Sequence, residues 1–349
     1  MIGYIIFFLC LFSILRIKES QKKISLSILI VVLFSTLRYG IGYDYYGYYN
    51  DIVKLDDFIL SRYEPIPKLF MQLAHWLGIP EIFFFLSSLF ISYFFFKGIQ
   101  KSKYINDSII FYICFPLLFM DHLGIIRQGM ATAVIFYAIT SLKGQYFKQV
   151  FFIFIAILCH KSAFSAFALL LPLQKLNRLT LIALFISSFI IGDIFVTLFS
   201  DLVQSLPVIL SSKYNEYIEM NEQLEGNKMR YLLYIITFLS LLFYKKLINL
   251  SEDNKYFIAL LVIGCSIYVI FININTSIAK RIAMFFFSSS IIVIPYFRKI
   301  AKVPSNMYNL FLVLLMSFSI YVSSKTISSR AEDRGIYNHQ YPYRTIFQK

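Results

Sequence analysis

Charged side chains are rare in this 349-residue chain, and several stand beside long apolar runs where they could bind an anion. Arg38 follows an apolar run, whereas Arg127 and Arg281 stand near the start of one. A guanidinium matches the oxygens of a phosphate and stays charged when it leaves water, and a helix N-terminus adds its own attraction for anions. Together with Lys161, these residues predict a shared anionic ligand. Each arginine taken singly could equally extend to the lipid head groups.

Two groups could carry a proton and are therefore candidate catalytic residues. His160 precedes Lys161 at an interruption between two apolar runs, and histidine titrates near neutral pH. A structural hydrogen bond at a helix break explains His160 equally well. Asp44 stands in "LRYGIGYDYYGYY", where its carboxylate could accept the proton of a sugar hydroxyl. It could also cap a helix or pair with Arg38.

Tyrosines surround Asp44 in the same stretch. Tyrosine usually marks the membrane interface, but its ring could also stack on the apolar face of a sugar. A carboxylate, Glu64, opens a nearby proline-flanked segment. The residues predicted to contact sugar are Tyr45, Tyr48, Tyr49 and Glu64.

The elements that must position these residues are membrane helices. The chain is 58% hydrophobic and 15% charged, whereas about a quarter of the residues of a soluble domain are charged. Apolar runs recur along its length, separated by short polar clusters, and a helix needs about 20 residues to cross the hydrocarbon core. The alternating pattern of a membrane β-barrel does not occur. The sequence predicts an all-α polytopic membrane protein.

The distribution of basic residues predicts the topology and accounts for the net charge of +14. Six short connections hold about half of the 33 Lys and Arg residues but only about a fifth of the 19 acidic ones, which is the bias of a cytoplasmic face. The charge therefore indicates topology and no nucleic acid partner. If these basic connections are all placed on the cytoplasmic side, the chain crosses the membrane about twelve times and both termini lie outside. The expected organisation is a single membrane domain, 1–349, with external segments at 38–80, 201–228 and 324–349.

Two segments are too short or too broken to be simple spans. Residues 65–78 are flanked by prolines and predict a half-helix that enters from outside. Residues 148–159 and 162–173 predict a broken pair that meets at His160 and Lys161, with one long helix as the less favoured alternative. Such elements persist at membrane depth only where protein or a water-filled cavity covers them.

Several motifs with known chemistry are missing. The sequence has no dinucleotide-binding glycine motif after a strand, no Walker loop, no DxD in a soluble domain and no HExxH. Its four cysteines all stand in apolar runs without CxxC spacing. A nucleotide-dependent transferase or ATPase is therefore disfavoured, and we expect neither a cofactor nor a metal.

Three stretches, taken in order, resemble the EpsG/Wzy family of bacterial polysaccharide polymerases. "LRYGIGYDYYGYY" is similar to the R-x-x-x-G-x-D-Y-x-x-Y signature of that family. "IIRQGMATAVIFYAI" and "ILCHKSAFSAFALLLPL" resemble its R-Q-x-x-A helix and H-K-S-A break. "RIAMFFFSSSIIVIPYF" and "YNHQYPYRTIF" resemble its late arginine helix and closing tyrosine–proline element.

The resemblance implies an inverting membrane glycosyltransferase of the GT-C type. Its substrates would be undecaprenyl-pyrophosphate-linked oligosaccharide repeat units of an O-antigen, capsule or exopolysaccharide. The reaction would take place on the outer, periplasm-facing side of the bacterial inner membrane, with a chain-length-regulating membrane protein as a further partner. Gln128, beside Arg127 in the R-Q-x-x-A motif, joins Arg38, Lys161 and Arg281 as a residue expected to bind the pyrophosphate.

Two other functions stay open at this point. A transporter or flippase of lipid-linked oligosaccharide would use similar basic residues, but it would tend to show two similar halves, which the sequence lacks. A membrane acyltransferase that modifies surface glycans would use a histidine such as His160.

Overall fold

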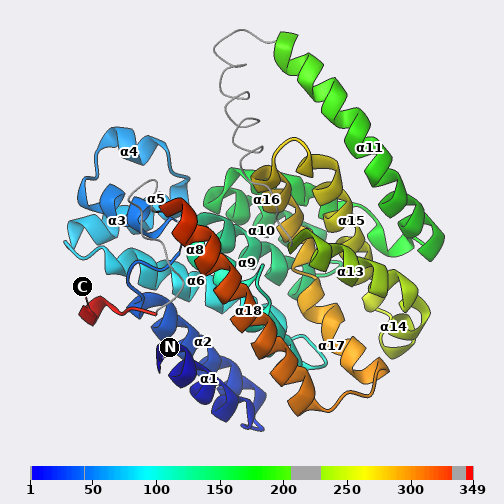
Figure 1. Cartoon of the computed structure of the whole chain (residues 1–349), viewed down its shortest axis with the longest axis horizontal. Helices are drawn as coiled ribbons and strands as arrows, with labels where there is room; N and C mark the ends of the chain where they lie inside the picture. The colour runs from blue at the N-terminus through cyan, green and yellow to red at the C-terminus, as the bar shows by residue number, and fades with distance from the viewer. Residues whose placement is uncertain (1, 43, 206–228, 332–342, 349) are drawn as a thin grey trace. The chain divides into compact units, whose positions relative to one another are not determined.

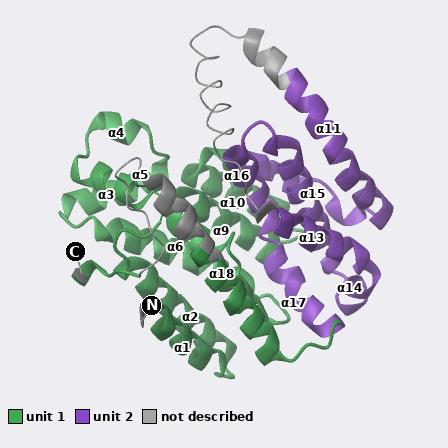
Figure 2. Cartoon of the chain, viewed as in Figure 1, with its two compact units in different colours: residues 1–164, 301–349 green, residues 165–300 purple. Residues whose placement is uncertain are grey.

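The computed structural model describes residues 2–42, 44–205, 229–331 and 343–348, and helices form most of this part of the chain (Figure 1). The other backbone pairing within it is one isolated antiparallel β-bridge between Arg38 and Thr345. The predicted all-α class is confirmed. The helices gather in two compact units, residues 1–164 with 301–349 and residues 165–300 (Figure 2).

The first unit holds the N-terminal helices and the last long one. Its helices are α1 (Ile2–Leu15), α2 (Ser20–Leu37), α3 (Tyr45–Val53), α4 (Asp57–Ser61), α5 (Pro65–Trp76), α6 (Glu81–Ile99), α7 (Ile105–Cys114), α8 (Phe119–Gly124), α9 (Ile126–Ser141), α10 (Tyr146–Cys159), α18 (Ser305–Ala331) and the 3₁₀ helix η3 (Ile346–Gln348).

Helix α9 is the centre of the first unit, because most of its residues are buried and it packs against α6, α8 and α10. Helix α6 packs in turn against α2 and α5. Phenylalanine fills the space between these helices; Phe95, for example, stacks on Tyr112 with ring centroids 4.4 Å apart. The ring of Phe95 also lies 5.3 Å from that of Phe136, so this aromatic core holds the second half of α9.

The segment 38–80, predicted to be external, folds into three short helices. Helix α4 is capped by Asp56, whose carboxylate accepts a hydrogen bond from the Ile59 amide at 2.6 Å. Helix α5 begins at Pro65, a position where a missing N–H costs nothing, and buries Pro67, Met71 and Ala74 along one face. Glu64 immediately precedes this helix, so its place is fixed by the first turn of α5.

The predicted break between 148–159 and 162–173 is confirmed. Helix α10 ends at Cys159, and His160 is extended, with φ −160° and ψ 127°. A 3₁₀ helix, η1 (Lys161–Leu170), follows at once.

The second unit is built around α15. Its elements are η2 (Leu173–Lys175), α11 (Arg178–Ser205), α13 (Met229–Leu242), α14 (Tyr244–Leu250), α15 (Asn254–Ile272), α16 (Thr276–Phe287) and α17 (Ser290–Ile300). Helix α15 packs against α11, α13, α16 and α17. Helices α13 and α14 meet at a bend of 73°, and α16 and α17 at a bend of 63°.

Four helices of the described residues are long and apolar enough to cross a membrane, or up to six if each bent pair is one span. The predicted number of twelve crossings is not confirmed. Several of the predicted spans are helices shorter than the roughly 20 residues that a straight crossing needs; α7, for example, has 10 residues and α10 has 14. The chain is a multi-pass membrane protein by the length and composition of its apolar helices.

Two of the predicted external segments lie partly outside the described residues. Helix α18 continues to Ala331, so the first residues of 324–349 are helical, and residues 332–342 lie outside the described part. Most of the segment 201–228 also lies outside the described residues.

Candidate functional site

Arg127 is the centre of a cluster of polar side chains in the first unit. It is the second residue of α9, and its side chain is 28% exposed. Nη1 donates to Glu64 Oε2 at 2.8 Å and to the Arg62 carbonyl at 3.3 Å, while Nε donates to the Tyr48 hydroxyl at 3.4 Å. Nη2 has no hydrogen-bond partner among the described residues, so the held guanidinium keeps donors for a ligand.

Glu64 is the acidic partner that holds Arg127, and its side chain is only 6% exposed. Its second oxygen, Oε1, accepts the Lys161 backbone N–H at 3.3 Å. Burial would raise the pKa of this carboxyl, but the positive charge of Arg127 and hydrogen bonds outweigh that effect and lower the pKa below its usual value. Glu64 therefore stays ionised and links α5, α9 and the break after α10.

Two tyrosines form the walls beside the guanidinium. The Arg127 side chain lies over the ring of Tyr63, with 4.9 Å from Cζ to the ring centroid, a contact favourable for a cation. Burial raises the pKa of Tyr48 to about 12, so its phenol remains a neutral hydroxyl. Both rings orient Arg127 without neutralising it.

His160 belongs to a hydrogen-bonded group at the break after α10. Its Nδ1 lies 3.2 Å from the Ser162 backbone nitrogen and 2.7 Å from Ser162 Oγ. Ser162 Oγ also lies 3.0 Å from the side-chain oxygen of Gln128, which is 1% exposed. Gln128 adjoins Arg127 on α9, so this group and the Arg127–Glu64 pair are parts of one site.

Lys161 takes part in this site through its backbone, whereas Asp44 acts on it through its charge. Lys161 contributes its backbone N–H to Glu64, while its side chain is exposed. Asp44 is half-buried at the N-cap position of α3 and makes no side-chain cap hydrogen bond. Its negative charge acts on Tyr48, where it adds to the raised pKa of the phenol. The charges of Asp44 and Arg127 therefore act on the same phenol in opposite directions.

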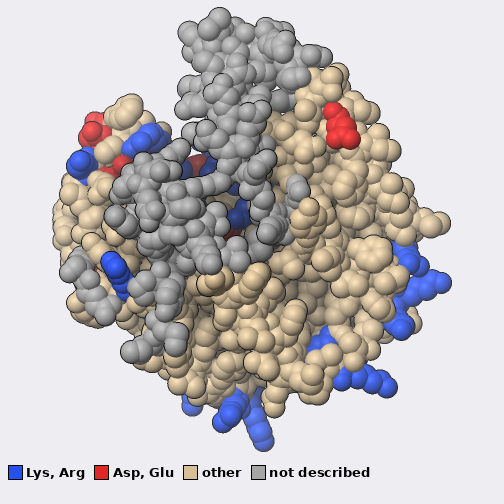
Figure 3. All heavy atoms as spheres, viewed as in Figure 1, with Lys and Arg blue, Asp and Glu red and all other residues tan. Residues whose placement is uncertain are grey.

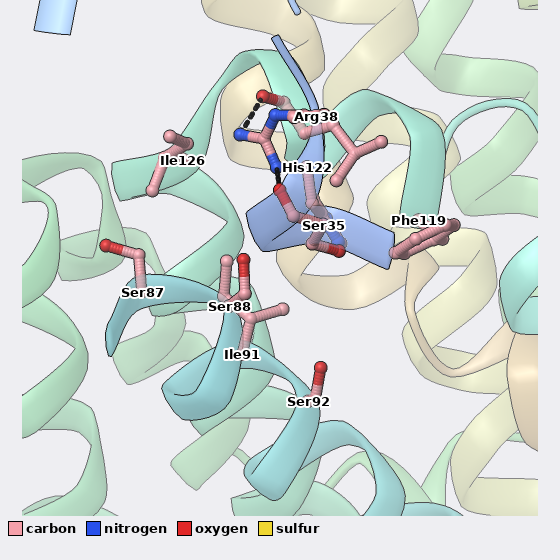
Figure 4. A pocket seen from close by; sticks show the side chains of 10 residues that line it. Ser35, Arg38, Ser87, Ser88, Ile91, Ser92, Phe119, His122 and Ile126 are labelled. Carbon is pink, nitrogen blue, oxygen red and sulfur yellow. Dashed lines mark hydrogen bonds between the residues drawn. The ribbon is translucent and has the colours of Figure 1, made fainter. Parts of the chain in front are cut away.

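Arg38 has a position that does not support the predicted role as an anion ligand. It is 1% exposed and donates to three backbone carbonyls, those of Ile41 at 3.0 Å, Ser35 at 2.7 Å and Leu123 at 3.0 Å. The polar cavity beside it (Figure 4) has a volume of about 10 Å³, which is room for one water. A pyrophosphate cannot enter this space, so we leave Arg38 out of the proposed site.

The predicted sugar-binding tyrosines fall in different surroundings. Tyr45 is fully buried and stacks on Phe84 with ring centroids 4.5 Å apart, so its ring has no face for a sugar. Tyr48 is buried against Arg127. Tyr49 is half-buried on α3, and its role in sugar binding stays a prediction.

Arg281 is an exposed residue of α16 in the second unit. Its predicted contact with the same pyrophosphate stays a prediction. Among the described residues, no group of three His, Cys, Asp or Glu side chains could hold a metal ion.

Two residues that the sequence did not single out complete the site. Ser162 stands two residues after His160 in the H-K-S-A stretch, and the signal for it was a hydroxyl close to a histidine at a helix break. Tyr63 precedes Glu64, but nothing in the sequence indicates that its ring contacts an arginine more than sixty residues later.

Charged side chains of both signs also gather around α3 and α4, whereas most of the visible surface carries none (Figure 3).

A comparison with protein families is in agreement with these motifs. The model of the EpsG family matches residues 21–345, a range that contains Arg127, Glu64, His160 and the bridge to Thr345. No curated protein and no solved structure matches the chain. Because the match covers nearly the whole sequence, the chain belongs to the EpsG family and is a membrane protein of polysaccharide biosynthesis.

Proposed function

We propose that this protein joins undecaprenyl-pyrophosphate-linked oligosaccharide repeat units into a polysaccharide. The observation that carries the proposal is Arg127, a partly exposed guanidinium that Glu64, Tyr48 and Tyr63 hold in place with donors left over. A preorganised cation of this kind stabilises charge that develops on a leaving group. The family supports a role in polysaccharide biosynthesis.

The proposed reaction is a direct displacement at the anomeric carbon of one repeat unit. A hydroxyl of the second repeat unit forms the new C–O bond, the bond to the pyrophosphate oxygen breaks, and that oxygen keeps the electron pair. Arg127 neutralises the charge that appears there, together with the exposed ammonium of Lys161. We assign the hydroxyl proton to the Asp44 carboxylate, and inversion follows from a single displacement.

A lipid-linked substrate is consistent with the absence of a nucleotide-binding motif from the sequence. A lipid-linked donor carries its own activated leaving group, so the chain needs no motif for a nucleotide. The proposed place of the reaction is the outer face of the bacterial inner membrane, because the basic clusters that mark the cytoplasmic face lie in other segments.

The test is an elongation assay with the purified full chain in detergent and a lipid-pyrophosphate-linked repeat unit, without nucleotide. A ladder of longer glycans is expected. Detergent removes the membrane barrier, so a flippase would leave the repeat unit unchanged, and an acyltransferase would need an acyl donor. A folded protein that gives no ladder with its cognate repeat unit contradicts the proposal.

A further inference from the structure

The backbone at the end of α10 brings a histidine ring and a following amide together. The His160 N–H donates to the Ala156 carbonyl at 2.9 Å, which closes the last turn of α10, and the His160 carbonyl accepts the Ala163 N–H at 3.0 Å. Between these bonds the chain is extended at His160. The ring consequently faces the amide and the hydroxyl of Ser162.

The Ser162 amide decides which ring nitrogen of His160 carries the proton. A backbone N–H only donates, and it lies 3.2 Å from Nδ1. Nδ1 must therefore offer a lone pair, which places the single proton of the neutral ring on Nε2. A proton on Nδ1 would point at the amide hydrogen, so the imidazolium form and the other neutral form are both disfavoured.

Ser162 and Gln128 keep this arrangement in place. Ser162 Oγ lies 2.7 Å from Nδ1 and 3.0 Å from the Gln128 side chain. The Ser162 amide donates to Nδ1, and the Ser162 hydroxyl supports the same form when its hydrogen also points to Nδ1. Gln128 is buried on α9, so the position of Ser162 is tied to the same helix that carries Arg127.

The position of His160 relative to the ion pair follows from Glu64. Its Oε1 accepts the N–H of Lys161, the residue next to His160, and its Oε2 accepts from Arg127. Glu64 thus connects the Arg127 guanidinium to the chain segment that carries His160.

We propose that His160 is a hydrogen-bond donor through Nε2–H to the departing pyrophosphate oxygen, and that Ser162 is the positioning residue that fixes this form. The inference rests on the proposed function. In the displacement, the bond to the pyrophosphate oxygen breaks with its electron pair, His160 donates a hydrogen bond to that oxygen and keeps its proton, and the acceptor hydroxyl proton goes to Asp44. His160 is then not the base that the sequence suggested as one alternative.

The activity test compares three substitutions of His160 in the elongation assay. Glutamine carries an N–H at about the distance of Nε2 from Cα, whereas asparagine reaches only about as far as Nδ1. His160→Gln should keep activity within about 10-fold of wild type, and His160→Asn and His160→Ala should lose about 100-fold, the usual loss for a removed donor. If His160 were the base, H160Q would be as inactive as H160A, because glutamine cannot accept the proton.

The tautomer can be measured without activity. Nitrogen-15 NMR of the full chain with labelled histidine should show the His160 resonances, identified by their loss in H160Q, in the Nε2–H form, and Ser162→Ala should weaken this preference. An Nδ1–H ring or an imidazolium at neutral pH overturns the inference. If wild type gives no ladder, the proposed function fails while the NMR result still decides the tautomer. If wild type elongates glycans but H160Q does not, only the present inference fails.

Discussion

At the scale of single residues, two arginines that the sequence predicts to bind the same anion differ in their surroundings. Arg127 keeps donors facing its surroundings because one carboxylate, one carbonyl and one phenol occupy only part of its fork. In Arg38, Nε, Nη1 and Nη2 each donate to a backbone carbonyl in the core. Both arginines make three hydrogen bonds, so accessibility separates them: the Arg127 side chain is 28% exposed, whereas Arg38 is 1% exposed.

Glu64 gives a prediction about pH. Its folded-state pKa is lowered because the charge of Arg127 outweighs burial, so its contribution to stability is present above the unfolded-state pKa, about 4.3. That contribution is lost as the pH falls through the lower folded-state pKa. Glu64→Gln should therefore lower the thermal unfolding temperature by a constant amount between about pH 5.5 and pH 8.

Thermal unfolding of wild type and Glu64→Gln across this range measures the effect. The difference should shrink only in more acidic buffer. A difference that disappears between about pH 5.5 and pH 7 would mean that the folded-state pKa is raised, and the account of the ion pair would then be wrong. Asp51→Asn is the matched control, because Asp51 forms a more exposed ion pair with Arg62.

At the scale of elements, the loop after α2 is built to fasten three segments together. Arg38 connects this loop to the end of α8 through the Leu123 carbonyl and pairs with Thr345 near the C-terminus. Tyr39 adds a hydrogen bond from its N–H to the Arg344 carbonyl at 2.9 Å. Gly42, with φ +111°, lets the loop approach Leu123 so closely that a Cβ would collide with the Leu123 carbonyl oxygen.

Substitutions in this loop should affect stability and not substrate binding. Hydrogen bonds from a charged donor are worth about 1.5–3 kcal/mol each, and lysine cannot reach three carbonyls, so Arg38→Lys should cost about 3 kcal/mol or more. Gly42→Ala should also destabilise, through strain and collision. Thermal unfolding and the KM of surviving activity check this: a normal unfolding temperature with a raised KM for R38K would restore Arg38 as a ligand.

Most helix positions could be predicted from the apolar runs and from the polar clusters that separate them. Apolar runs between basic clusters correspond to α1, α2, α6, α9 and α10, and the polar break at His160 appears where the pattern is interrupted. Burial could not be predicted, because it depends on which helices meet. Arg38 and Tyr45 looked like surface groups beside a run of tyrosines, yet packing of α6 against α2 encloses Arg38, and Phe84 of α6 covers Tyr45.

The positions of the helix ends determine which residues meet in the candidate site, and the sequence does not reveal these contacts. The spacing of Glu64, Arg127 and His160 in the sequence says nothing about their contact. Proline at the start of α5, the start of α9 after α8 and the break after α10 place these three residues together. Ser162 became visible as a partner of His160 only from the turn geometry of η1.

At the scale of the whole molecule, the family match extends across both compact units. Arg127 lies in the first unit and Arg281 in the second. The sequence predicts that Arg281 contributes to the same reaction as Arg127, so Arg281→Ala should lower elongation by about 100-fold, and the double variant with Arg127→Ala should lose less than the product of the two single losses.

A double-mutant cycle of elongation rates decides this point. Arg298→Ala, a change in the last turn of α17, is the control for loss of a basic residue from the second unit, and it should leave elongation near wild type. Strictly multiplicative losses for R127A and R281A would show that the two arginines contribute independently of each other.

Arg127 is proposed to stabilise the departing pyrophosphate, and the elongation rate of Arg127→Ala measures that contribution. The control is Arg62→Ala, which removes a neighbouring arginine whose side chain is 51% exposed while the carbonyl that accepts from Arg127 is kept. R127A should lose about 100-fold or more of the elongation rate, whereas R62A should stay near wild type. A correctly folded R127A that extends lipid-linked repeat units at a rate close to wild type would contradict the proposed role.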